Sequence, residues 1–469
     1  MQEYDIVIGL EVHSELKTNS KVFCSCKNEF GQAPNTNCCP VCVGLPGALP
    51  VLNKKAVELV IKAGLTMDCE INDLAVFERK NYFYPDLAKA YQISQLVRPI
   101  CIGGHIDLKN KKVRLNRIHL EEDAGKLVHG TQAIGTLIDY NRGGVPLMEL
   151  VTEPDISSAD EAVEFLTKLR QKLIYAGVAE CKMEQGGMRC DVNVSVKPKG
   201  SSEFGQRTEM KNLNSFKSVY RAINYEANRQ IEILRNGGTI VQETRKWDDN
   251  HEKSISMRKK ETSSDYRYFP DPDMLAVEIS REDVEKIKAT LPLMPDQLKE
   301  KFMGTYGLSE YESDILTKEK SLSDYFNQVL EHFDNAKEVS NWILTEILNR
   351  VKDGESDEIK ISPIELAKLL KLVEDKKVTR TNAKEMLTRV WEGESLEALE
   401  KEYGGRVDGD QLKTIVQNIV ENNPKAVEDY KTSDTPEKVF RWFTGQVMKE
   451  TKGKANASKA EEFIREFLK

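Results

Sequence analysis

The sequence lacks the features that mark a membrane-embedded or exported protein. None of its 469 residues falls in an apolar run long enough to span a bilayer. The N-terminal segment MQEYDIVIGLEVH has neither the basic start and apolar stretch of a signal peptide nor the Arg- and Ser-rich composition of a transit peptide. Charged residues make up 31% of the chain and hydrophobic residues 39%, which is typical of globular proteins. These absences predict a protein without membrane segments in the cytoplasm of a bacterium.

The sequence also lacks the common motifs of nucleotide-binding and hydrolytic enzymes. It contains no G-x-x-x-x-G-K-[ST] loop, no G-x-G-x-x-G that opens a helix after a strand, and no G-x-S-x-G elbow. The net charge is -8, so no overall basic excess marks nucleic-acid binding. Residues 431–469 do carry nine Lys and Arg against six Asp and Glu, although a solvated helical face gives the same count. If the protein binds a nucleotide, we expect it to do so with a fold other than the common nucleotide-binding folds.

Periodicity divides the chain into a mixed region and a helical region. The segment IVIGLEVHSEL alternates, so that Glu11 and His13 share the polar side of a predicted strand. Ser158 and Glu161 have the spacing of a capping box, and a second helix is predicted from about Ser215. After about residue 290 the chain is rich in Lys, Glu and Leu with helical spacing, and a Gly-rich break follows at 403–411. We therefore predict an α+β fold with several domains.

Four cysteines near the N-terminus have the spacing of a structural zinc site. Cys24 and Cys26 form one C-x-C pair, and Cys39 and Cys42 form a C-x-x-C pair after a short loop. Two such pairs can close a tetrahedral site, and Cys38 competes with Cys39 for the third position. A disulfide cluster or reduced free thiols are the alternatives. The other cysteines are scattered and are expected to be ordinary buried thiols: Cys69, Cys101, Cys181 and Cys190.

Carboxylates are numerous in the predicted strands, whereas the whole chain has six histidines. This composition suits a hard divalent cation such as Mg²⁺, and Mg²⁺ in turn suggests phosphate chemistry. Acidic residues at strand ends are more often solvated or salt-bridged, so spacing alone leaves both alternatives open. The candidates are Glu11, His13, His119, Glu121, Glu122, Asp123, Glu149, Glu184 and Asp191.

A second cluster of chemically active side chains lies in FERKNYFYPDLAKAYQISQ, residues 77–95. It combines Arg79, Lys80 and Lys89 with several tyrosines. Cations that alternate with aromatic residues can hold a phosphate, a base or the end of a tRNA. The alternative is a tyrosine-rich pair of core strands with lysines at the surface.

Long segments throughout the chain resemble a single family. They are GLEVHSELKT, NTNCCPVCVGLPGALPVLN, FERKNYFYPDLAKAYQISQ, LEEDAGK, NRGGVPLMELVTEPD, MRCDVNVSV, EMKNLNSF, QETRKW, DYRYFPDPD and GQVMKETKGKANAS. They resemble the B subunit of the glutamine-dependent aspartyl/glutamyl-tRNA(Asn/Gln) amidotransferases, the GatB family. The related archaeal subunit has a large inserted domain that is not visible here, so the bacterial type fits better.

The resemblance implies a ligase that acts in protein biosynthesis as one subunit of a heterotrimer. In this family the B subunit uses ATP to phosphorylate the side-chain carboxylate of misacylated Glu-tRNA(Gln) or Asp-tRNA(Asn). The amidase (glutaminase) A subunit supplies ammonia through a channel, and the small C subunit joins the other two. The implied cofactors are ATP, Mg²⁺ and structural Zn²⁺. Which tRNA is the substrate is left open.

The changes in composition near residues 292 and 405 set the expected domain boundaries, and the resemblance implies what each domain does. Residues 1–292 are expected to form a catalytic cradle on a mixed, mainly antiparallel sheet. Residues 293–405 are expected to form a helical domain, and residues 406–469 a tRNA-binding tail whose positive excess suits backbone contacts.

Roles follow from the resemblance for individual residues. The expected catalytic residues are Glu11, His13, Glu122 and Glu149, the last three as magnesium ligands. Cys24, Cys26, Cys39 and Cys42 are expected to bind zinc, which is structural because four thiolates leave no open position. From their charge, the residues expected to contact ATP phosphates or the tRNA end are Arg79, Lys80 and Lys89, and the further candidate partners of the metal site are Glu184 and Asp191.

Two other functions compete with this one. The first is a non-catalytic, zinc-bearing scaffold that binds tRNA, and the second is a metal-stabilised protein without an enzymatic role. Retention of His13, Glu122 and Glu149 argues against the scaffold. The chain has no Ser–Ser–Lys amidase motif, so we expect no glutaminase activity from it alone.

Overall fold

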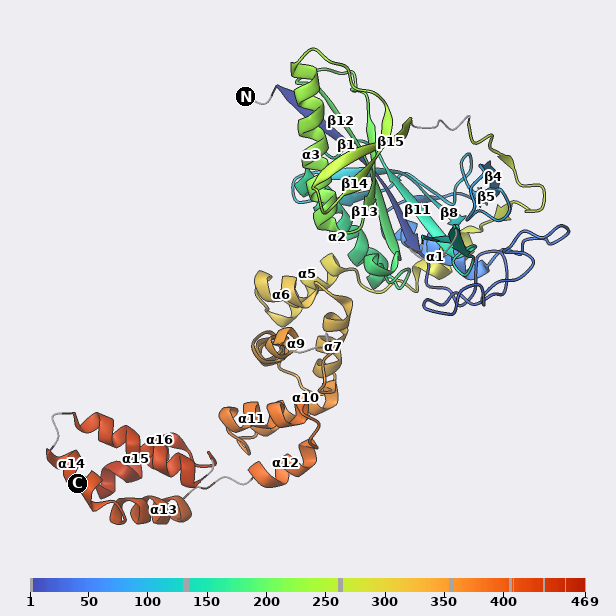
Figure 1. Ribbon diagram of the computed structural model, residues 1–469. Coiled ribbons are helices and arrows are strands. Elements are labelled where there is room, and N and C mark those ends of the chain that lie inside the picture. Colours follow the sequence, from blue (N-terminus) through green and yellow to red (C-terminus); the bar gives the residue numbers. More distant parts are fainter. Residues whose placement is uncertain are drawn as a thin grey trace. The chain divides into compact units, whose positions relative to one another are not determined.

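The computed structural model describes residues 3–129, 135–259, 265–353, 358–404, 407, 409–432, 435–451 and 453–468. The chain divides into two compact units, residues 1–295 and 296–469, which are considered separately (Figure 1). The predicted boundary at residues 405 and 406 lies outside the described residues. No helix in the described ranges is both long enough and apolar enough to cross a membrane.

The first unit is built on a large mixed sheet. The strand order is β15-β14-β13-β12-β1-β11-β8-β6-β2, and β7 also pairs with β8. Neighbours are antiparallel except β13 and β14, which are parallel. The α+β prediction is thus confirmed. The strands of this sheet are β1 (Tyr4–Glu15), β2 (Glu70–Ile71), β6 (Cys101–Ile102), β7 (His105–Asp107), β8 (Lys112–Glu122), β11 (Pro146–Thr152), β12 (Met188–Pro198), β13 (Thr208–Leu213), β14 (Glu243–Asp248) and β15 (Lys253–Lys259).

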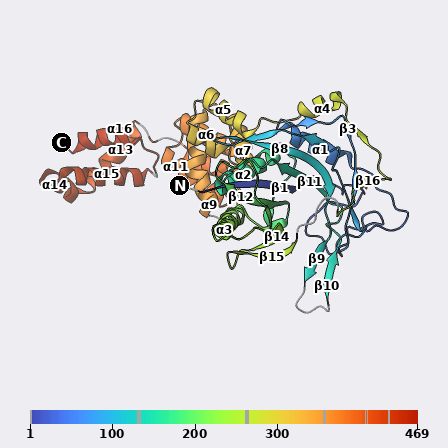
Figure 2. The ribbon, with the colours of Figure 1, turned by 90° about the horizontal axis from the view of Figure 1, so that it is seen from above.

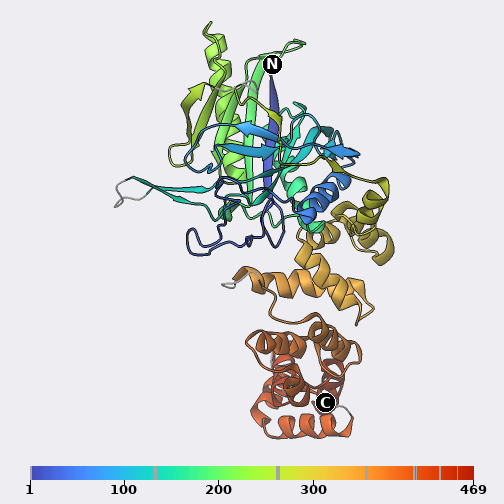
Figure 3. The same cartoon turned by 90° about the vertical axis from the view of Figure 1, so that its right-hand side faces the viewer.

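Three smaller sheets flank the large one. Strand β4 lies between β5 and β16, β9 pairs with β10, and β3 pairs with β17. Figures 2 and 3 both show the β9–β10 hairpin projecting away from the large sheet. The bounds are β3 (Leu74–Ala75), β4 (Glu78–Asn81), β5 (Tyr91–Ser94), β9 (Lys126–His129), β10 (Thr136–Asp139), β16 (Phe269–Pro270) and β17 (Val277–Glu278).

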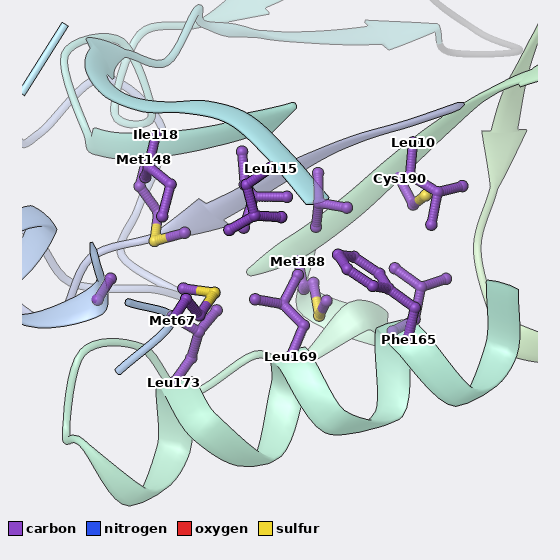
Figure 4. Packing of buried hydrophobic residues seen from close by; sticks show 14 of the residues in the cluster. Leu10, Met67, Leu115, Ile118, Met148, Phe165, Leu169, Leu173, Met188 and Cys190 are labelled. Atoms are coloured by element: carbon purple, nitrogen blue, oxygen red, sulfur yellow. The ribbon is translucent and has the colours of Figure 1, made fainter. Parts of the chain in front are cut away.

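Helices cover the apolar side of the large sheet. Alternation along β1 buries Ile8, Leu10 and Val12 on that side, and β12 buries Val192 and Val194 in the same core. Figure 4 shows Phe165, Leu169 and Leu173 of α2, whose side chains point towards the sheet and fill the core between helix and sheet. Glu11 and His13 consequently lie on the opposite, polar side of the sheet. The helices of this unit are α1 (Lys54–Leu65), α2 (Ala159–Tyr175), η1 (Met183–Gln185), α3 (Phe216–Arg235) and α4 (Arg281–Lys288).

Serine side chains form the N-caps of α2 and α3. The Ser158 hydroxyl accepts the amide of Glu161 at 3.2 Å, and the Ser215 hydroxyl accepts the amide of Ser218 at 3.0 Å. The Glu161 carboxylate accepts the amide of Ser157 instead of that of Ser158, so only half of the predicted capping box is present. Both helices therefore start where the sequence predicts, with a different return bond in α2.

Within the described residues of the second unit, every regular element is a helix, and Val407 and Ala455 form an isolated bridge. Its last helices bury their own apolar cluster, which includes Leu412, Val416, Phe443 and Ile464. The helices are α5 (Pro295–Tyr306), α6 (Glu310–Leu316), α7 (Lys320–Leu330), α8 (Ala336–Trp342), the π-helix η2 (Ile343–Ile347), α9 (Leu348–Asp353), α10 (Pro363–Glu374), α11 (Arg380–Trp391), α12 (Leu396–Tyr403), α13 (Asp410–Glu421), α14 (Pro424–Thr432), α15 (Pro436–Glu450) and α16 (Ala457–Phe467).

Candidate active site

Three adjacent strands place their polar side chains in one row. In the pairing of β1 with β11, His13 lies opposite Glu149, and in the pairing of β11 with β8, Glu149 lies opposite His119. Glu11 and Glu121 are each two residues from a member of this row, so strand alternation brings them to the same side. The five side chains therefore meet although they come from three distant segments.

The distances define one cluster, which we call the acidic cluster: Glu11, His13, His119, Glu121 and Glu149. His13 Nε2 lies 3.4 Å from a carboxylate oxygen of Glu121 and 3.4 Å from one of Glu149. His119 Nε2 lies 3.4 Å from Glu149 and 3.6 Å from Glu121. Two subsets have ligand atoms within 4.8 Å of one another: Glu11, His13 and Glu149, and His119, Glu121 and Glu149. Glu149 belongs to both subsets and is the centre of the cluster.

The charges of this cluster are strongly coupled. Burial opposes charge on His13, but Glu149, Glu121 and Glu11 outweigh it and raise the pKa of His13 to about 9. Burial likewise opposes ionisation of Glu149, but His119 and His13 outweigh it and hold the pKa of Glu149 well below its usual range. Burial, followed by the charge of Glu149, raises the pKa of Glu11. The carboxylates thus favour positive charge among them, which in the metal-free protein is carried by His13.

Glu122 does not join this cluster, contrary to the expected grouping with His13 and Glu149. Its carboxylate accepts a hydrogen bond from Lys89 Nζ at 2.7 Å and another from the amide of Ile93 at 2.9 Å. The neighbouring Glu121 takes the expected place. The reason is the pleat of β8, which sends consecutive side chains to opposite sides of the strand.

Two of the three cations of segment 77–95 are engaged in ion pairs. Lys89 pairs with Glu122, as described above. Arg79 binds Asp271 through Nε at 2.7 Å and Asp273 through Nη2 at 2.8 Å, and its guanidinium lies 4.1 Å from the centroid of the Tyr91 ring. Both cations therefore connect parts of the protein to each other.

Lys80 has different surroundings. Its Nζ lies 4.9 Å from the centroid of the Tyr266 ring and 5.9 Å from that of Tyr82. Burial opposes its charge, but Tyr268, Glu121 and Glu149 outweigh burial and raise the pKa of Lys80. Lys80 therefore remains charged and lies near the carboxylates of the acidic cluster.

The last two predicted contact residues lie in different places. Asp191 is opposite Glu11 in the pairing of β1 with β12, and its carboxylate forms an ion pair with Lys211 Nζ. Asp191 therefore adjoins the acidic cluster. Glu184 is exposed on η1, before β12 begins, and belongs to none of the groups of clustered ligands in the described residues.

The four predicted zinc ligands converge. The Sγ atoms of Cys24, Cys26, Cys39 and Cys42 lie within 4.8 Å of one another, and all four thiols are free. Cys38 Sγ lies 3.8 Å from Asn141 Oδ1 and is not a member of the group. The donor set and its spacing fit one tetrahedral Zn²⁺.

Comparisons with known proteins cover nearly all of the chain. Residues 6–285 match the model of the GatB/GatE catalytic domain, and residues 324–468 match that of the GatB domain. The chain belongs to the GatB family. Proteins named as the B subunit of aspartyl/glutamyl-tRNA(Asn/Gln) amidotransferase are similar over 99% of both chains, with 51% identity in Caldicellulosiruptor bescii and 48% in Caldanaerobacter subterraneus subsp. tengcongensis. One from Thermodesulfovibrio yellowstonii is 47% identical over 100% of both chains. The chain is thus a GatB subunit of a tRNA-dependent amidotransferase, a component of a ligase.

Within this GatB chain, sequence reasoning noted His119 and Glu121 but assigned neither to the site. His119 and Glu121 are two residues apart in RIHLEED, and this spacing predicts that both side chains lie on the same side of a strand. Lys211, which pairs with Asp191 and lies two strands from β1, had no local signal because its partner is 20 residues away in sequence. The pairing of β1 with β11 and of β11 with β8 shows which of these residues lie together.

Proposed function

We propose that this GatB chain activates the side-chain carboxylate of misacylated Glu-tRNA(Gln), Asp-tRNA(Asn) or both with ATP. An oxygen of that carboxylate forms a bond to the γ-phosphorus while the bond to the bridging oxygen breaks, so that an acyl phosphate and ADP result. Ammonia then attacks the acyl carbon, inorganic phosphate leaves, and the nitrogen loses a proton to give the amide. The observation that carries this proposal is the acidic cluster on the polar side of the sheet.

The donors of the cluster fit a divalent cation. Carboxylate oxygens are the ligands that Mg²⁺ prefers, and Glu121 and Glu149 offer them from neighbouring strands beside His13. A bound Mg²⁺ would offset the charge of the phosphates and orient the transferring group. The side chains of His119 and Glu121 are 3% exposed, so the protein presents these donors in fixed positions.

Other groups around the cluster have supporting roles. Lys80 would bind an anionic phosphate oxygen, because it is a positive charge beside the cluster. Lys211 would hold Asp191 in place, and Arg117 Nη2, 3.8 Å from Glu149, would limit the movement of that carboxylate. Lys89 would do the same for Glu122.

The cysteine group is proposed to bind a structural Zn²⁺. The loop that carries it, between β1 and α1, has an isolated bridge between Ser20 and Lys27 and no strand or helix. Val22 and Phe23 join the core of the first unit, but Phe30, Leu45 and Leu49 farther along the loop are exposed, so a metal can add stability where the core does not reach.

The C-terminal helices are proposed to contact the tRNA. A groove of 890 Å³ beside α14 and α15 is lined by Lys425, Lys438 and Arg441 together with the partly exposed Trp442. Cations beside an exposed aromatic ring suit a phosphate backbone and an unstacked base.

We further propose that the chain works in the bacterial cytoplasm in a heterotrimer with an amidase (glutaminase) partner and a small third protein. The described chain offers the acidic cluster for activation, while the source of ammonia is assigned to the partner. The competing function is a scaffold that binds tRNA without performing the activation.

Transamidation by the reconstituted complex tests the proposal. Misacylated Glu-tRNA(Gln) and Asp-tRNA(Asn) would be supplied separately with ATP, Mg²⁺ and ammonium chloride in place of glutamine. We expect amide formation that needs ATP and this chain, and a loss of about 100-fold or more for Glu149→Gln. Glu232→Gln, at an exposed position of α3, is the matched control and should behave as the unmodified complex. Full activity of Glu149→Gln would support the scaffold instead.

A further inference from the structure

The surroundings of Lys80 differ from those of the other two cations near the acidic cluster. Arg79 and Lys89 each bind carboxylates directly. The Lys80 ammonium forms no hydrogen bond or ion pair with any residue that the structure describes, and its neighbours are aromatic rings. An ammonium held by ring faces keeps its N–H donors available for an anion.

The rings come from two separate segments. Tyr82 follows β4 directly, whereas Tyr266 and Tyr268 belong to residues 265–273, which we call the strap. The rings meet edge to face, with centroids 5.9 Å apart for Tyr82 and Tyr266 and 6.4 Å apart for Tyr266 and Tyr268. Aromatic edges and faces attract in this geometry, so the rings hold one another as well as the lysine.

The strap is fixed to β4 by hydrogen bonds of Asn81 on one side of Lys80 and by strand pairing at Arg79 on the other. The amide of Asn81 donates to the carbonyl of Tyr266 at 2.8 Å, and its side-chain amide donates to the carbonyl of Arg267 at 2.9 Å. Strand β16 of the strap pairs with β4 so that Phe269 lies opposite Arg79. Arg79 in turn binds Asp271 and Asp273, which also belong to the strap. Arg79 thus holds the strap to β4.

These contacts restrict a side chain that is otherwise flexible. A free lysine loses rotamer entropy when its ammonium is held in one place. The cage lowers this cost at the time of binding, because the rotamer is already selected by the rings.

We propose that Tyr82, Tyr266 and Tyr268 form an aromatic cage that positions the Lys80 ammonium beside Glu121 and Glu149, where it binds a phosphate oxygen of ATP. The strap is therefore part of the active site, and its tyrosines are positioning residues. This inference rests on the proposed function, because it assigns the phosphate of that reaction to one lysine.

The test compares variants of the full chain in the reconstituted complex. Tyr266→Leu removes the ring, and we expect the Kd for ATP, measured by equilibrium dialysis, to rise about tenfold and kcat/KM for ATP to fall at least as much. Tyr266→Phe keeps the ring face and should stay within about threefold of the unmodified complex. Phe204→Leu changes an exposed aromatic residue outside the strap and should have no effect.

A double-mutant cycle separates the cage from a purely structural role. Lys80→Met should weaken ATP binding, and Lys80→Arg should restore part of it. In the Lys80→Met background, Tyr266→Leu should add less than about a twofold change. An equal effect of Tyr266→Leu in both backgrounds would overturn the proposal, because the ring would then act independently of the lysine.

The unmodified complex distinguishes failure of this inference from failure of the proposed function. If that complex forms no amide with ATP and ammonium, the proposed function is wrong and the cage has no phosphate to position. If it is active while Tyr82→Leu and Tyr266→Leu both bind ATP normally, only the cage is wrong. Thermal unfolding of each variant shows whether it has folded.

Discussion

Consecutive glutamates of β8 have different partners. Glu121 lies with His13 and His119, whereas Glu122 accepts hydrogen bonds from Lys89 and from a main-chain amide. The pleat of the strand separates them, so a shift of one residue exchanges a ligand of the cluster for a member of a buried ion pair.

Because their partners differ, Glu121→Gln is expected to change the Mg²⁺ requirement, whereas Glu122→Gln is expected to change stability. Glu121→Gln should raise the Mg²⁺ concentration needed for half-maximal transamidation about tenfold or more, because a charged ligand becomes neutral. The measurement is a Mg²⁺ titration at saturating ATP. An unchanged Mg²⁺ requirement for this variant would exclude Glu121 from the metal site.

Glu122→Gln should instead lower stability. The side chains of Lys89 and Glu122 are 12% and 5% exposed, so the variant leaves a buried ammonium without its counter-charge. We expect a loss of about 3 kcal/mol in the free energy of unfolding. Chemical denaturation measures this, and the Mg²⁺ requirement of any folded fraction should be nearly normal.

At the scale of elements, the cysteine loop joins the core through Val22 and Phe23, and its remaining support comes from its ligands and surface hydrogen bonds. Its four converging thiols predict that metal removal loosens this loop before the sheet unfolds. The loop is also held to the segment around β10, since the amide of Asn35 donates to Asp139 at 3.0 Å and that of Asn37 donates to Asn141 at 2.8 Å.

Cys38 and Cys39 are neighbours, so replacing each in turn gives a test of zinc binding and its control. The purified protein should contain about one Zn²⁺ per chain, Cys39→Ser should lose most of it, and Cys38→Ser should retain it. Zinc is measured by elemental analysis and loop stability by limited proteolysis. Full zinc in Cys39→Ser together with loss in Cys38→Ser would assign the third ligand to Cys38.

The start of α6 carries a pH-dependent contribution to stability. Glu312 accepts hydrogen bonds from Ser309 and from Lys337 of α8. Burial opposes its charge, but Lys337 and Ser309 outweigh burial and lower the pKa of Glu312 to about 2. A carboxyl whose pKa is lower in the folded protein stabilises it above the unfolded pKa, near 4.5, and loses that contribution as the pH falls towards 2.

We therefore expect Glu312→Gln to lower the free energy of unfolding by about 1–2 kcal/mol at pH 7, since Lys337 is partly solvated. The difference from the unmodified protein should shrink as the pH falls below about 4. Denaturation at a series of pH values measures it. A constant difference down to pH 2.5 would contradict the assigned pKa.

At the scale of the whole molecule, the two compact units have distinct compositions and cores. The first unit contains the acidic cluster and the cysteine group, and the second contains the basic groove of α14 and α15. The proposed roles divide in the same way, with activation in the first unit and tRNA contact in the second.

This division predicts separable effects on the reaction. A chain that ends at residue 404 should raise the KM for misacylated tRNA about tenfold, while kcat with ammonium stays within about twofold. The full-length double variant Lys438→Glu and Arg441→Glu should show the same change and reduce the dependence of KM on salt. A large fall in kcat with unchanged KM in both proteins would contradict a tRNA-binding role.

Sequence by itself determined the features that depend on neighbours along the chain. Alternation placed Glu11 and His13 on one side of a strand, spacing selected the cysteines, and capping residues located the starts of α2 and α3. Each of these follows from backbone geometry within one element.

Only the tertiary structure decided which of these elements meet. Glu149 lies between His13 and His119 because β11 pairs with both β1 and β8, a register that no local pattern encodes. Tyr266 reaches Lys80 because the strap pairs with β4 from more than 180 residues away. Long-range strand pairing brings these residues together, and it depends on how the whole core packs.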